Sequence, residues 1–458
     1  MSLEEFFEPE SMAVVGASKT VGKVGNTVLK NLEEKFNGKI YPVNPKYDEI
    51  NGLECYESVE NIEEVPDNVV IAVPAKIANK VVKQCVELEV PTITMLTSGY
   101  EEIGERGEEL QEELEGYLED SSTRMIGPNC LGIWDGHSGI DSMFLPGYKI
   151  EEPSKGGIAL ISQSGAVGSA VLDRAASEGV GISKFVSYGN QLDVSETELI
   201  EYLEKDENTD AVAVYMEGAK DGRNFLEKTR EISKEMPVVV LKAGKTEKGS
   251  EAAESHTGSL AGNYRVYRGA FSQAGVVEAE KNEELIDYAK TLAKLEKPGG
   301  NRVAVVTNGG GFGVLSTDSI EKTSLELAEF SEETTEKLEE SMKDYGNVSN
   351  PLDLIGDATP EDYKKALDVI SEAEEVDMIL VISLMQTEQM GSEFVDILED
   401  IKNNSDKPVV GSTLGGDYTE LHKTYLEEAG IPMFSYPEEA VKSLEKLFRY
   451  HEWKDKRS

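Results

Sequence analysis

His256 is the residue whose surroundings best suit covalent chemistry. It lies in the segment ESHTGSLAG, residues 254–262, a small glycine-containing loop between two predicted helices, without the apolar neighbours of a core histidine. A neutral imidazole is nucleophilic near pH 7 and Gly258 would let the loop swing, so His256 could carry a phosphoryl group. A carrier of this kind needs a carboxylate on its other ring nitrogen, and Glu217, at the end of a predicted strand, is the candidate. The alternative is a loop histidine without a chemical role.

The remaining histidines offer less chemistry. None of them has metal-ligand spacing with a cysteine or a second histidine, so we expect no metal site in this chain. They are expected to lie on the surface: His137, His422 and His451.

A second candidate site is the turn SQSGAVG, residues 162–168, which follows the apolar run IALIS. A strand that delivers hydroxyls and a glycine to the start of a helix places them where the helix dipole and free N–H groups favour an anion. No lysine follows as in a Walker motif, so a single phosphoryl group suits the turn better than a nucleotide. The alternative is that Ser164 serves only as a helix N-cap.

A third turn, GASKTVGKVG at residues 16–25, also joins a strand to a helix. It is not a clean GxGxxG motif, and the next strand ends in VNPK, with Lys46 near the place where a dinucleotide site carries an acid. Lys46 favours an additional phosphate near a ribose, as coenzyme A carries. The alternative is a tight turn that only closes a strand–helix unit.

Further turns follow strands of the same predicted sheet, at residues 73–75 (VPA), 98–100 (SGY) and 127–132 (GPNCLG). Their small residues permit the close approach of a ligand. Cys130 could be a nucleophile, but no histidine has a local motif with it, and a small buried thiol is the commoner case. We therefore expect Cys130 to be structural.

The elements that position these turns alternate between short apolar runs and longer amphipathic segments, which predicts parallel strands with crossover helices. Linker-like stretches occur at residues 149–157 and 294–302, and each block opens with a strand, a turn and a helix. The predicted architecture is α/β with three doubly wound domains. The expected strands are 12–16, 39–43, 69–74, 158–162, 182–187, 211–215, 238–241, 303–307, 378–382 and 408–412, and the expected helices include 23–35, 76–89, 104–120, 166–178, 196–206 and 360–375.

Charge limits the classes of partner. The 458 residues carry 45 Lys and Arg against 88 Asp and Glu, a formal net charge of −43, which disfavours nucleic acids and anionic membrane surfaces. Self-repulsion of this size suggests adaptation to a salty cytoplasm, where the Debye length falls to about 3 Å at 1 M salt; a merely acidic enzyme is the alternative. Three cysteines, an acidic N-terminus and the lack of an apolar run of about 20 residues predict a cytoplasmic protein.

Several of these motifs together resemble the α subunit of the ADP-forming acetyl-CoA synthetases, within the succinyl-CoA synthetase superfamily. The resemblance extends from about Phe7 to Leu447. The loop SHTGSLAG at 255–262 is the most specific match. The others are GPNC at 127–130, SQSG at 162–165, SYGN at 187–190 and NPLD at 350–353.

The resemblance implies a fold and a set of site residues. The domains would be a Rossmann-like CoA-binding domain at residues 1–150, a flavodoxin-like domain with the phosphohistidine at 151–297, and a third flavodoxin-like ligase domain at 298–458. His256 would carry the phosphoryl group and Glu217 would orient it. The implied phosphate ligands are Ser162, Ser164 and Gly165; the implied CoA-binding residues are Gly16, Ser18, Gly22, Lys46, Pro74 and Asn129; the implied neighbours of the acyl group are Gly189 and Asn190.

The same resemblance implies a missing partner. We find no segment that resembles an ATP-grasp nucleotide domain, which other family members carry on a separate β subunit or fused to this one. A β subunit is therefore expected, in an α₂β₂ assembly, with Mg²⁺ entering beside ADP or ATP. The turn GGGFG at 309–313 is expected to open the third domain rather than to bind a nucleotide.

Two other functions compete with this hypothesis. One is a non-catalytic, regulatory CoA-binding protein of the same fold, which would need neither His256 nor Glu217. The other is an NAD-dependent dehydrogenase built on the first domain, against which Lys46 and the histidine loop both argue.

Overall fold

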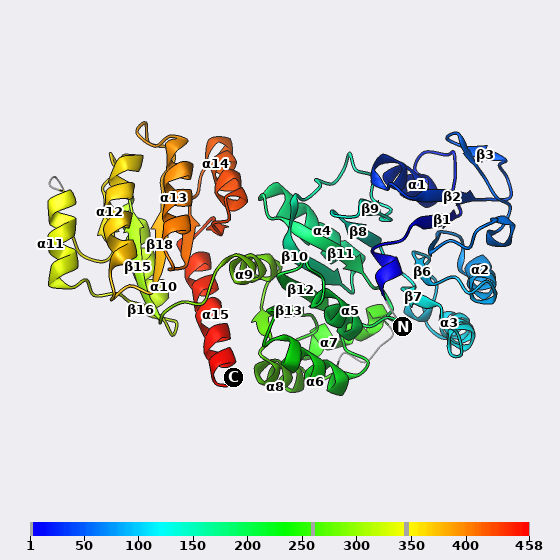
Figure 1. Cartoon of the computed structure of the whole chain (residues 1–458). Helices are drawn as coiled ribbons and strands as arrows, with labels where there is room; N and C mark the ends of the chain where they lie inside the picture. The colour runs from blue at the N-terminus through cyan, green and yellow to red at the C-terminus, as the bar shows by residue number, and fades with distance from the viewer. Residues whose placement is uncertain (1–2, 258–261, 343–347, 458) are drawn as a thin grey trace. The chain divides into compact units, whose positions relative to one another are not determined.

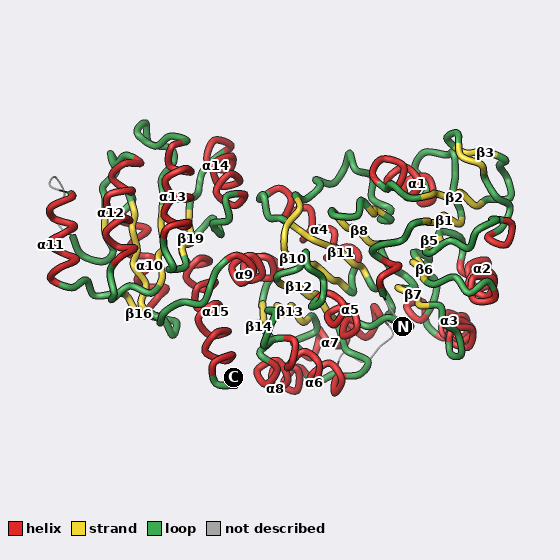
Figure 2. The backbone as a smooth tube through the Cα atoms, in the orientation of Figure 1, coloured by secondary structure: helices red, strands yellow, loops and turns green. Residues whose placement is uncertain are grey.

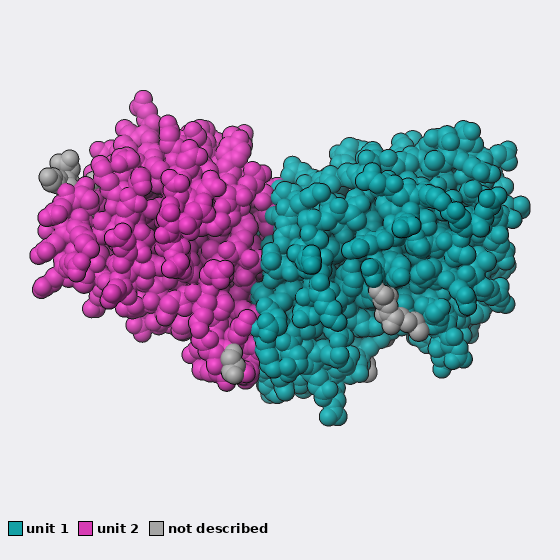
Figure 3. All heavy atoms as spheres, viewed as in Figure 1, with its two compact units in different colours: residues 1–176, 181–280 teal, residues 177–180, 281–458 magenta. Residues whose placement is uncertain are grey.

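The computed structural model describes residues 3–257, 262–342 and 348–457. They form two compact units, which Figure 3 shows in different colours. The first unit contains residues 1–176 and 181–280, and the second contains residues 177–180 and 281–458. Each unit is described by itself. Among the described residues, no helix is both long enough and apolar enough to cross a bilayer.

The first unit contains two sheets, visible in Figure 1. The N-terminal sheet has five parallel strands, flanked by the helices α1 (Val24–Lys35), α2 (Ala75–Glu87) and α3 (Glu105–Leu118). The strand order is β2 (Lys39–Val43), β1 (Ser11–Val15), β5 (Asn68–Ile71), β6 (Thr92–Met95) and β7 (Arg124–Ile126). The order starts from β1 and grows in both directions, as in a doubly wound fold.

The second sheet of this unit has seven strands. Five are parallel, and an antiparallel pair is added at one edge, where β8 pairs with β11. The strand order is β14 (Val277–Ala279), β13 (Val238–Lys242), β12 (Ala211–Met216), β10 (Lys155–Ser162), β11 (Ile182–Ser187), β8 (Gly132–Asp135) and β9 (Ile140–Asp141). Its helices are α4 (Gly165–Ser177), α5 (Glu196–Leu203), α6 (Gly222–Ile232), α7 (Glu247–Thr257) and α8 (Tyr264–Ala274).

One hydrophobic cluster joins the two sheets of the first unit. It contains Val14 and Val70 from the N-terminal sheet and Ile161 and Val214 from the second. Apolar strands buried on both faces are typical of parallel sheets covered by helices. This shared core fixes the carboxyl ends of the two sets of strands relative to each other.

The second unit is built on a third sheet, and Figure 2 shows helices flanking it. Its strands are all parallel: β16 (Glu326–Leu327), β15 (Arg302–Thr307), β18 (Met378–Ile382), β19 (Val409–Ser412) and β20 (Met433–Phe434), with β17 (Leu352–Asp353) also paired to β15. Its helices are α9 (Asn282–Lys294), α10 (Gly310–Ile320), α11 (Glu332–Ser341), α12 (Pro360–Glu372), α13 (Glu393–Asn404), α14 (Asp417–Glu428) and α15 (Pro437–Asp455).

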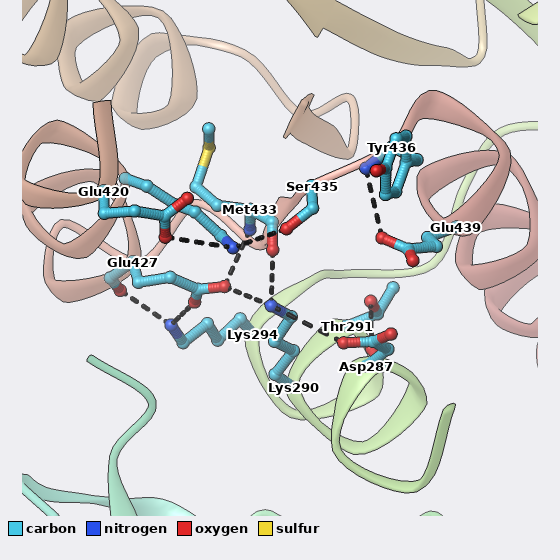
Figure 4. Close-up of polar contacts among 11 residues, drawn as sticks. Asp287, Lys290, Thr291, Lys294, Glu420, Glu427, Met433, Ser435, Tyr436 and Glu439 are labelled. Atoms are coloured by element: carbon cyan, nitrogen blue, oxygen red, sulfur yellow. Dashed lines mark hydrogen bonds and ion pairs between the residues drawn. The ribbon is translucent and has the colours of Figure 1, made fainter. Parts of the chain in front are cut away.

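A buried ion cluster ties α9 to the sheet of the second unit (Figure 4). The Lys290 ammonium is fully buried, 2.6 Å from the Glu427 carboxylate, and it donates to the Met433 carbonyl at 2.5 Å. Lys294 binds the other oxygen of Glu427 at 2.6 Å. Burial opposes the charge on Lys290, but Glu427 and Asp287 outweigh it and raise the pKa of this ammonium. Two cations on one carboxylate satisfy groups that would be costly to bury alone.

The predicted fold class is confirmed, because each block opens with a parallel strand, a turn and a helix as expected. The domain boundaries at 150/151 and 297/298 stay a prediction; β8 and β9 already belong to the second sheet, and α9 lies in the second unit. The surface position predicted for His422 is wrong. This side chain is only 4% exposed in α14, with its Nδ1 atom 2.7 Å from the Tyr418 carbonyl oxygen.

Candidate functional site

A cavity of about 470 Å³ lies at the carboxyl ends of strands β10, β11 and β12 in the first unit. Ligands bind at this edge in open α/β sheets. The structure brings six residues predicted from the sequence into the wall of this cavity: Asn129, Ser164, Gly165, Gly189, Asn190 and Glu217. Its other lining residues are Cys130, Leu131, Phe144, Leu145, Gln163, Ala166 and Ser169.

Two turns meet at one side of the cavity, and Gly189 lets them do so. Gly189 has φ +57°, and a Cβ atom there would lie 2.2 Å from the Pro128 carbonyl oxygen. The turns are joined by hydrogen bonds from the Asn190 N–H to the Pro128 carbonyl (3.0 Å) and from the Leu131 N–H to the Ser187 hydroxyl (3.0 Å). Only glycine fits this approach without displacing backbone.

The N-terminus of α4 opens on the cavity, since Gly165 and Ala166 line it. The Ser164 hydroxyl accepts a long hydrogen bond of 3.4 Å from the Val167 N–H, so it also caps the helix. Ser162 is fully buried and its hydroxyl donates to the Ser164 carbonyl at 2.7 Å. Ser162 therefore supports the turn and does not line the cavity, whereas Ser164 and Gly165 do. A helix start of this kind suits a phosphate-sized anion.

Glu217 follows β12 and is 6% exposed at the cavity wall. Its backbone N–H and that of Gly218 both donate to the Gln163 side-chain oxygen, at 2.8 and 3.3 Å. The Tyr215 hydroxyl donates to the Glu217 carboxylate at 3.4 Å. Gln163 was missed in the sequence because its partner lies 54 residues further along the chain.

The predicted carrier His256 lies in the last turn of α7, which continues to Thr257, where a loop was expected. The side chain of His256 is outside the described part of the structure, as are residues 258–261 of its loop. The helix itself contacts the short turn η3 (Glu101–Ile103) of the N-terminal sheet. Glu102 of this turn accepts a hydrogen bond from the side chain of Asn190, a residue of the cavity wall.

Asn129 and Asn190, predicted as ligands of CoA and of the acyl group, are hydrogen-bonded to each other at 3.2 Å. The Asn190 amide also donates to Glu102 at 2.8 Å and to Gln111 at 3.2 Å, so both of its donors are engaged. Asn190 therefore connects the cavity wall to the N-terminal sheet.

The remaining predicted CoA residues lie outside the cavity wall, at the carboxyl ends of β1, β2 and β5. Gly16 has φ +95° and packs against the Ala72 carbonyl, while Ser18 accepts a hydrogen bond of 3.1 Å from the Thr20 N–H. Lys46 is exposed, next to Asn44, and Pro74 is the N-cap residue of α2. Gly22 lies in the exposed turn before α1. Two exposed lysines of this edge were not singled out in the sequence: Lys19 and Lys23.

Cys130 is buried, and its thiol donates to the Met95 carbonyl at 3.2 Å. Burial raises the pKa of this thiol to about 12, which disfavours a nucleophilic role. The apolar wall of Phe144 and Leu145 was not predicted. Asn31 of α1 fixes this segment by donating to the Met143 and Leu145 carbonyls at 2.9 and 3.0 Å.

The glycine-rich turn at 309–313 differs from the turn before α4. An oxygen of Asp353 lies 2.2 Å from the position that a Cβ on Gly310 would take, at the first residue of α10. A carboxylate there complements the positive end of the helix dipole. A carboxylate beside this helix start would repel an external phosphate.

Comparison with known proteins matches three segments of this chain to family models. A CoA binding domain model matches residues 10–135, a succinyl-CoA ligase like flavodoxin domain matches 155–292, and a ligase-CoA domain matches 303–454. The chain is 42% identical to acetate–CoA ligase [ADP-forming] I of Archaeoglobus fulgidus over 448 residues, which are 98% of this chain and 64% of that protein. It is 39% identical to the acetate–CoA ligase [ADP-forming] I subunit alpha of Pyrococcus furiosus, covering 100% of this chain and 99% of that one.

A solved structure is also similar: Ca. Korarchaeum cryptofilum dinucleotide forming acetyl-coenzyme A synthetase 1, in complex with phosphate and ADP. It has a TM-score of 0.91 and 34% identity, covering 99% of this chain and 98% of that chain. The chain belongs to the ADP-forming acetate–CoA ligase family. It spans about 64% of the length of the Archaeoglobus relative and nearly all of the Pyrococcus subunit.

Proposed function

We propose that this chain is the α subunit of an ADP-forming acetyl-CoA synthetase that converts acyl-CoA, ADP and phosphate to acid, ATP and CoA. The observation that carries the proposal is the cavity in which the N-terminus of α4, the Glu217 carboxylate and the Gly189 turn meet. A binding module for CoA would have no use for a carboxylate beside a phosphate-sized site. The family and its named relatives support the same reaction.

The reaction is proposed in three steps. A phosphate oxygen attacks the thioester carbonyl, the C–S bond breaks, and CoA leaves as the thiol with a proton from phosphate. A nitrogen of His256 then attacks the phosphorus of the acyl phosphate; the P–O bond breaks and the carboxylate leaves. Finally a β-phosphate oxygen of ADP takes the phosphoryl group, the P–N bond breaks, and ATP forms.

The roles of the residues follow from their chemistry. The start of α4, with Ser164 and Gly165, offers N–H groups and a dipole to the phosphoryl group as charge develops on its oxygens. Glu217 orients His256 and stabilises its positive charge during transfer. Exposed lysines at the edge of the N-terminal sheet, including Lys46, are proposed to bind phosphates of CoA.

The proposal includes a partner. An ATP-grasp β subunit would bind ADP and supply Mg²⁺, which neutralises phosphate charge when bound, in an α₂β₂ assembly. The described residues contain no group of three or more His, Cys, Asp or Glu side chains placed to hold a metal ion. The Pyrococcus relative is itself named a subunit alpha, which supports a separate partner. A cytoplasmic location is also proposed, supported by three free cysteines: Cys55, Cys85 and Cys130.

Labelling with radioactive phosphate tests the reaction. The full chain, mixed with its partner, acetyl-CoA and [³²P]phosphate but no ADP, is expected to acquire an acid-labile, base-stable label. His256→Ala should abolish the label and retain CoA binding. No label in the wild-type complex would contradict the proposed function and favour the regulatory CoA-binding protein.

A further inference from the structure

A buried lysine, which the proposed reaction does not use, lies at the end of β13. Lys242 is 1% exposed. Its ammonium donates to the backbone carbonyl of Glu217 and to that of Ala243, both at 2.6 Å. It also lies 4.7 Å from the centroid of the Tyr267 ring, within the range of a cation–π interaction. Glu217 is thus held through its backbone by a desolvated cation.

The whole turn after β12 is held in a similar way. The Glu217 N–H donates to Gln163 at 2.8 Å on one side, and the Glu217 carbonyl accepts from Lys242 on the other. Two residues further, the Ala219 N–H donates to the Tyr267 hydroxyl at 3.0 Å. The side chains of Gln163, Lys242 and Tyr267 therefore hold the backbone on both sides of Glu217. Of the three, only Lys242 carries a charge.

The charge has a cost that a purely structural role would not require. Burial lowers the pKa of Lys242 to about 8; attraction to Glu217 opposes this shift, and the positive charge of Lys245 adds to it. A methionine at position 242 would fill the same volume and would continue the apolar run VVVL that precedes this position. It would, however, leave the two carbonyls that Lys242 binds without a donor. A cation here also offsets part of the Glu217 charge that an incoming phosphate would otherwise meet.

We propose that Lys242 is a positioning residue for the phosphoryl-transfer site: its ammonium fixes the peptide that carries Glu217 and keeps this acidic site able to accept a phosphate. The inference rests on the proposed function, because it gives Glu217 the role of orienting His256. Lys242 itself does not touch the reacting atoms. It acts through Glu217 and through its charge.

The test compares two variants with a matched control in the labelling reaction with acetyl-CoA and [³²P]phosphate. Lys242→Met removes the charge and both donors, while Lys242→Arg keeps a charge that does not titrate. Lys245→Met is the control, since the Lys245 ammonium pairs with Glu278 at 2.8 Å and donates to Ala279, away from Glu217. A displacement of about 1 Å at a reacting group costs on the order of 100-fold in rate.

We expect the labelling rate of Lys242→Met to fall about 10- to 100-fold at pH 7, with the KM for acetyl-CoA within about two-fold of wild type. At pH 7, where Lys242 is protonated in both proteins, Lys245→Met should label at the wild-type rate. The wild-type rate should fall as the pH rises above about 8, because the ammonium loses its proton there. Lys242→Arg should recover part of the rate and lose this alkaline decline.

The outcomes separate this inference from the proposed function. A wild-type complex that acquires no label overturns both. A label that is lost in His256→Ala but forms at the wild-type rate in folded Lys242→Met overturns only the role of Lys242. If Lys242→Met does not fold, the pH profiles still decide: identical profiles for wild type and Lys242→Arg would refute the inference.

Discussion

Replacing Gly189 by alanine puts a methyl group between two turns that form one side of the cavity. The new Cβ would lie 2.2 Å from the Pro128 carbonyl oxygen and 2.6 Å from that of Asn129. Ordinary contact begins near 3.4 Å. The turns must therefore separate by about 1 Å, which breaks the fit that the hydrogen bond from Asn190 to Pro128 now maintains.

The expected effect has two parts. An alanine held at φ +57° is in the left-handed region, which lowers the free energy of unfolding by about 1–2 kcal/mol. The displacement of the backbone lowers it further. A shift of about 1 Å in a site that aligns reacting groups costs on the order of 100-fold in rate. The variant should therefore fold, with a lower unfolding midpoint, and label slowly with acetyl-CoA and phosphate.

Single-turnover labelling and chemical unfolding measure the two effects, and Gly222→Ala provides the control. Gly222 is the first residue of α6, and a Cβ there would meet nothing within 4 Å. CoA binding should be largely retained in both variants, because of the proposed CoA residues only Asn129 lies in the displaced turn, and the others lie at the carboxyl ends of β1, β2 and β5. A folded Gly189→Ala variant that labels at the wild-type rate would refute the argument that contact between these turns aligns the site.

Three further predictions follow from buried groups and from net charge. Lys290→Met should lower the free energy of unfolding by about 3–5 kcal/mol in urea titrations, because it leaves Glu427 buried without this partner. Lys297→Met, which removes an exposed pair with Asp455, should lower it by less than about 1 kcal/mol. Equal losses in the two variants would contradict this prediction. Burial raises the pKa of Glu196 to about 7 from 4.5, so the folded state keeps a proton that the unfolded state releases. The free energy of unfolding should therefore fall as pH rises from about 4.5 to 7, and it should fall less steeply in Glu196→Gln. Equal slopes for the two proteins would contradict this prediction. The KM for CoA should fall as KCl rises from low salt, because screening weakens repulsion from a chain of charge −43; a rising KM would count against long-range repulsion.

The strand–turn–helix pattern could be predicted because it is local. Apolar runs such as residues 211–215 and 303–307 became strands with nearly the predicted bounds, and the turns at Gly16 and Ser164 lie at the carboxyl ends of their strands. The antiparallel addition of β8 and β9 could not be predicted, since it depends on pairing with a strand about 50 residues later. A short run such as GIWD does not specify its partner.

The candidate site divides in the same way. Ser164, Gly165 and Glu217 were predicted from local patterns and Gly189 from the family resemblance, and all four meet in one cavity. Gln163 and Lys242 were missed because each acts on Glu217 from a distant part of the chain. In the sequence, Lys242 follows the run VVVL as an ordinary charged residue that ends a strand. Its contact with Glu217 depends on burial of the ammonium, which the residue type alone argues against.

The turns before α4 and α10 show why a shared pattern does not give a shared chemistry. Both follow a central parallel strand, both are rich in small residues, and both begin a helix whose dipole attracts an anion. At α10 the carboxylate of Asp353, supplied from β17, lies beside the start of the helix. At α4 the neighbouring strand instead delivers Glu217 to the cavity wall, with a buried lysine beneath its peptide, so the helix start remains available to a ligand. In a chain of net charge −43, the acid that lies beside each helix start therefore distinguishes two turns that look alike in the sequence.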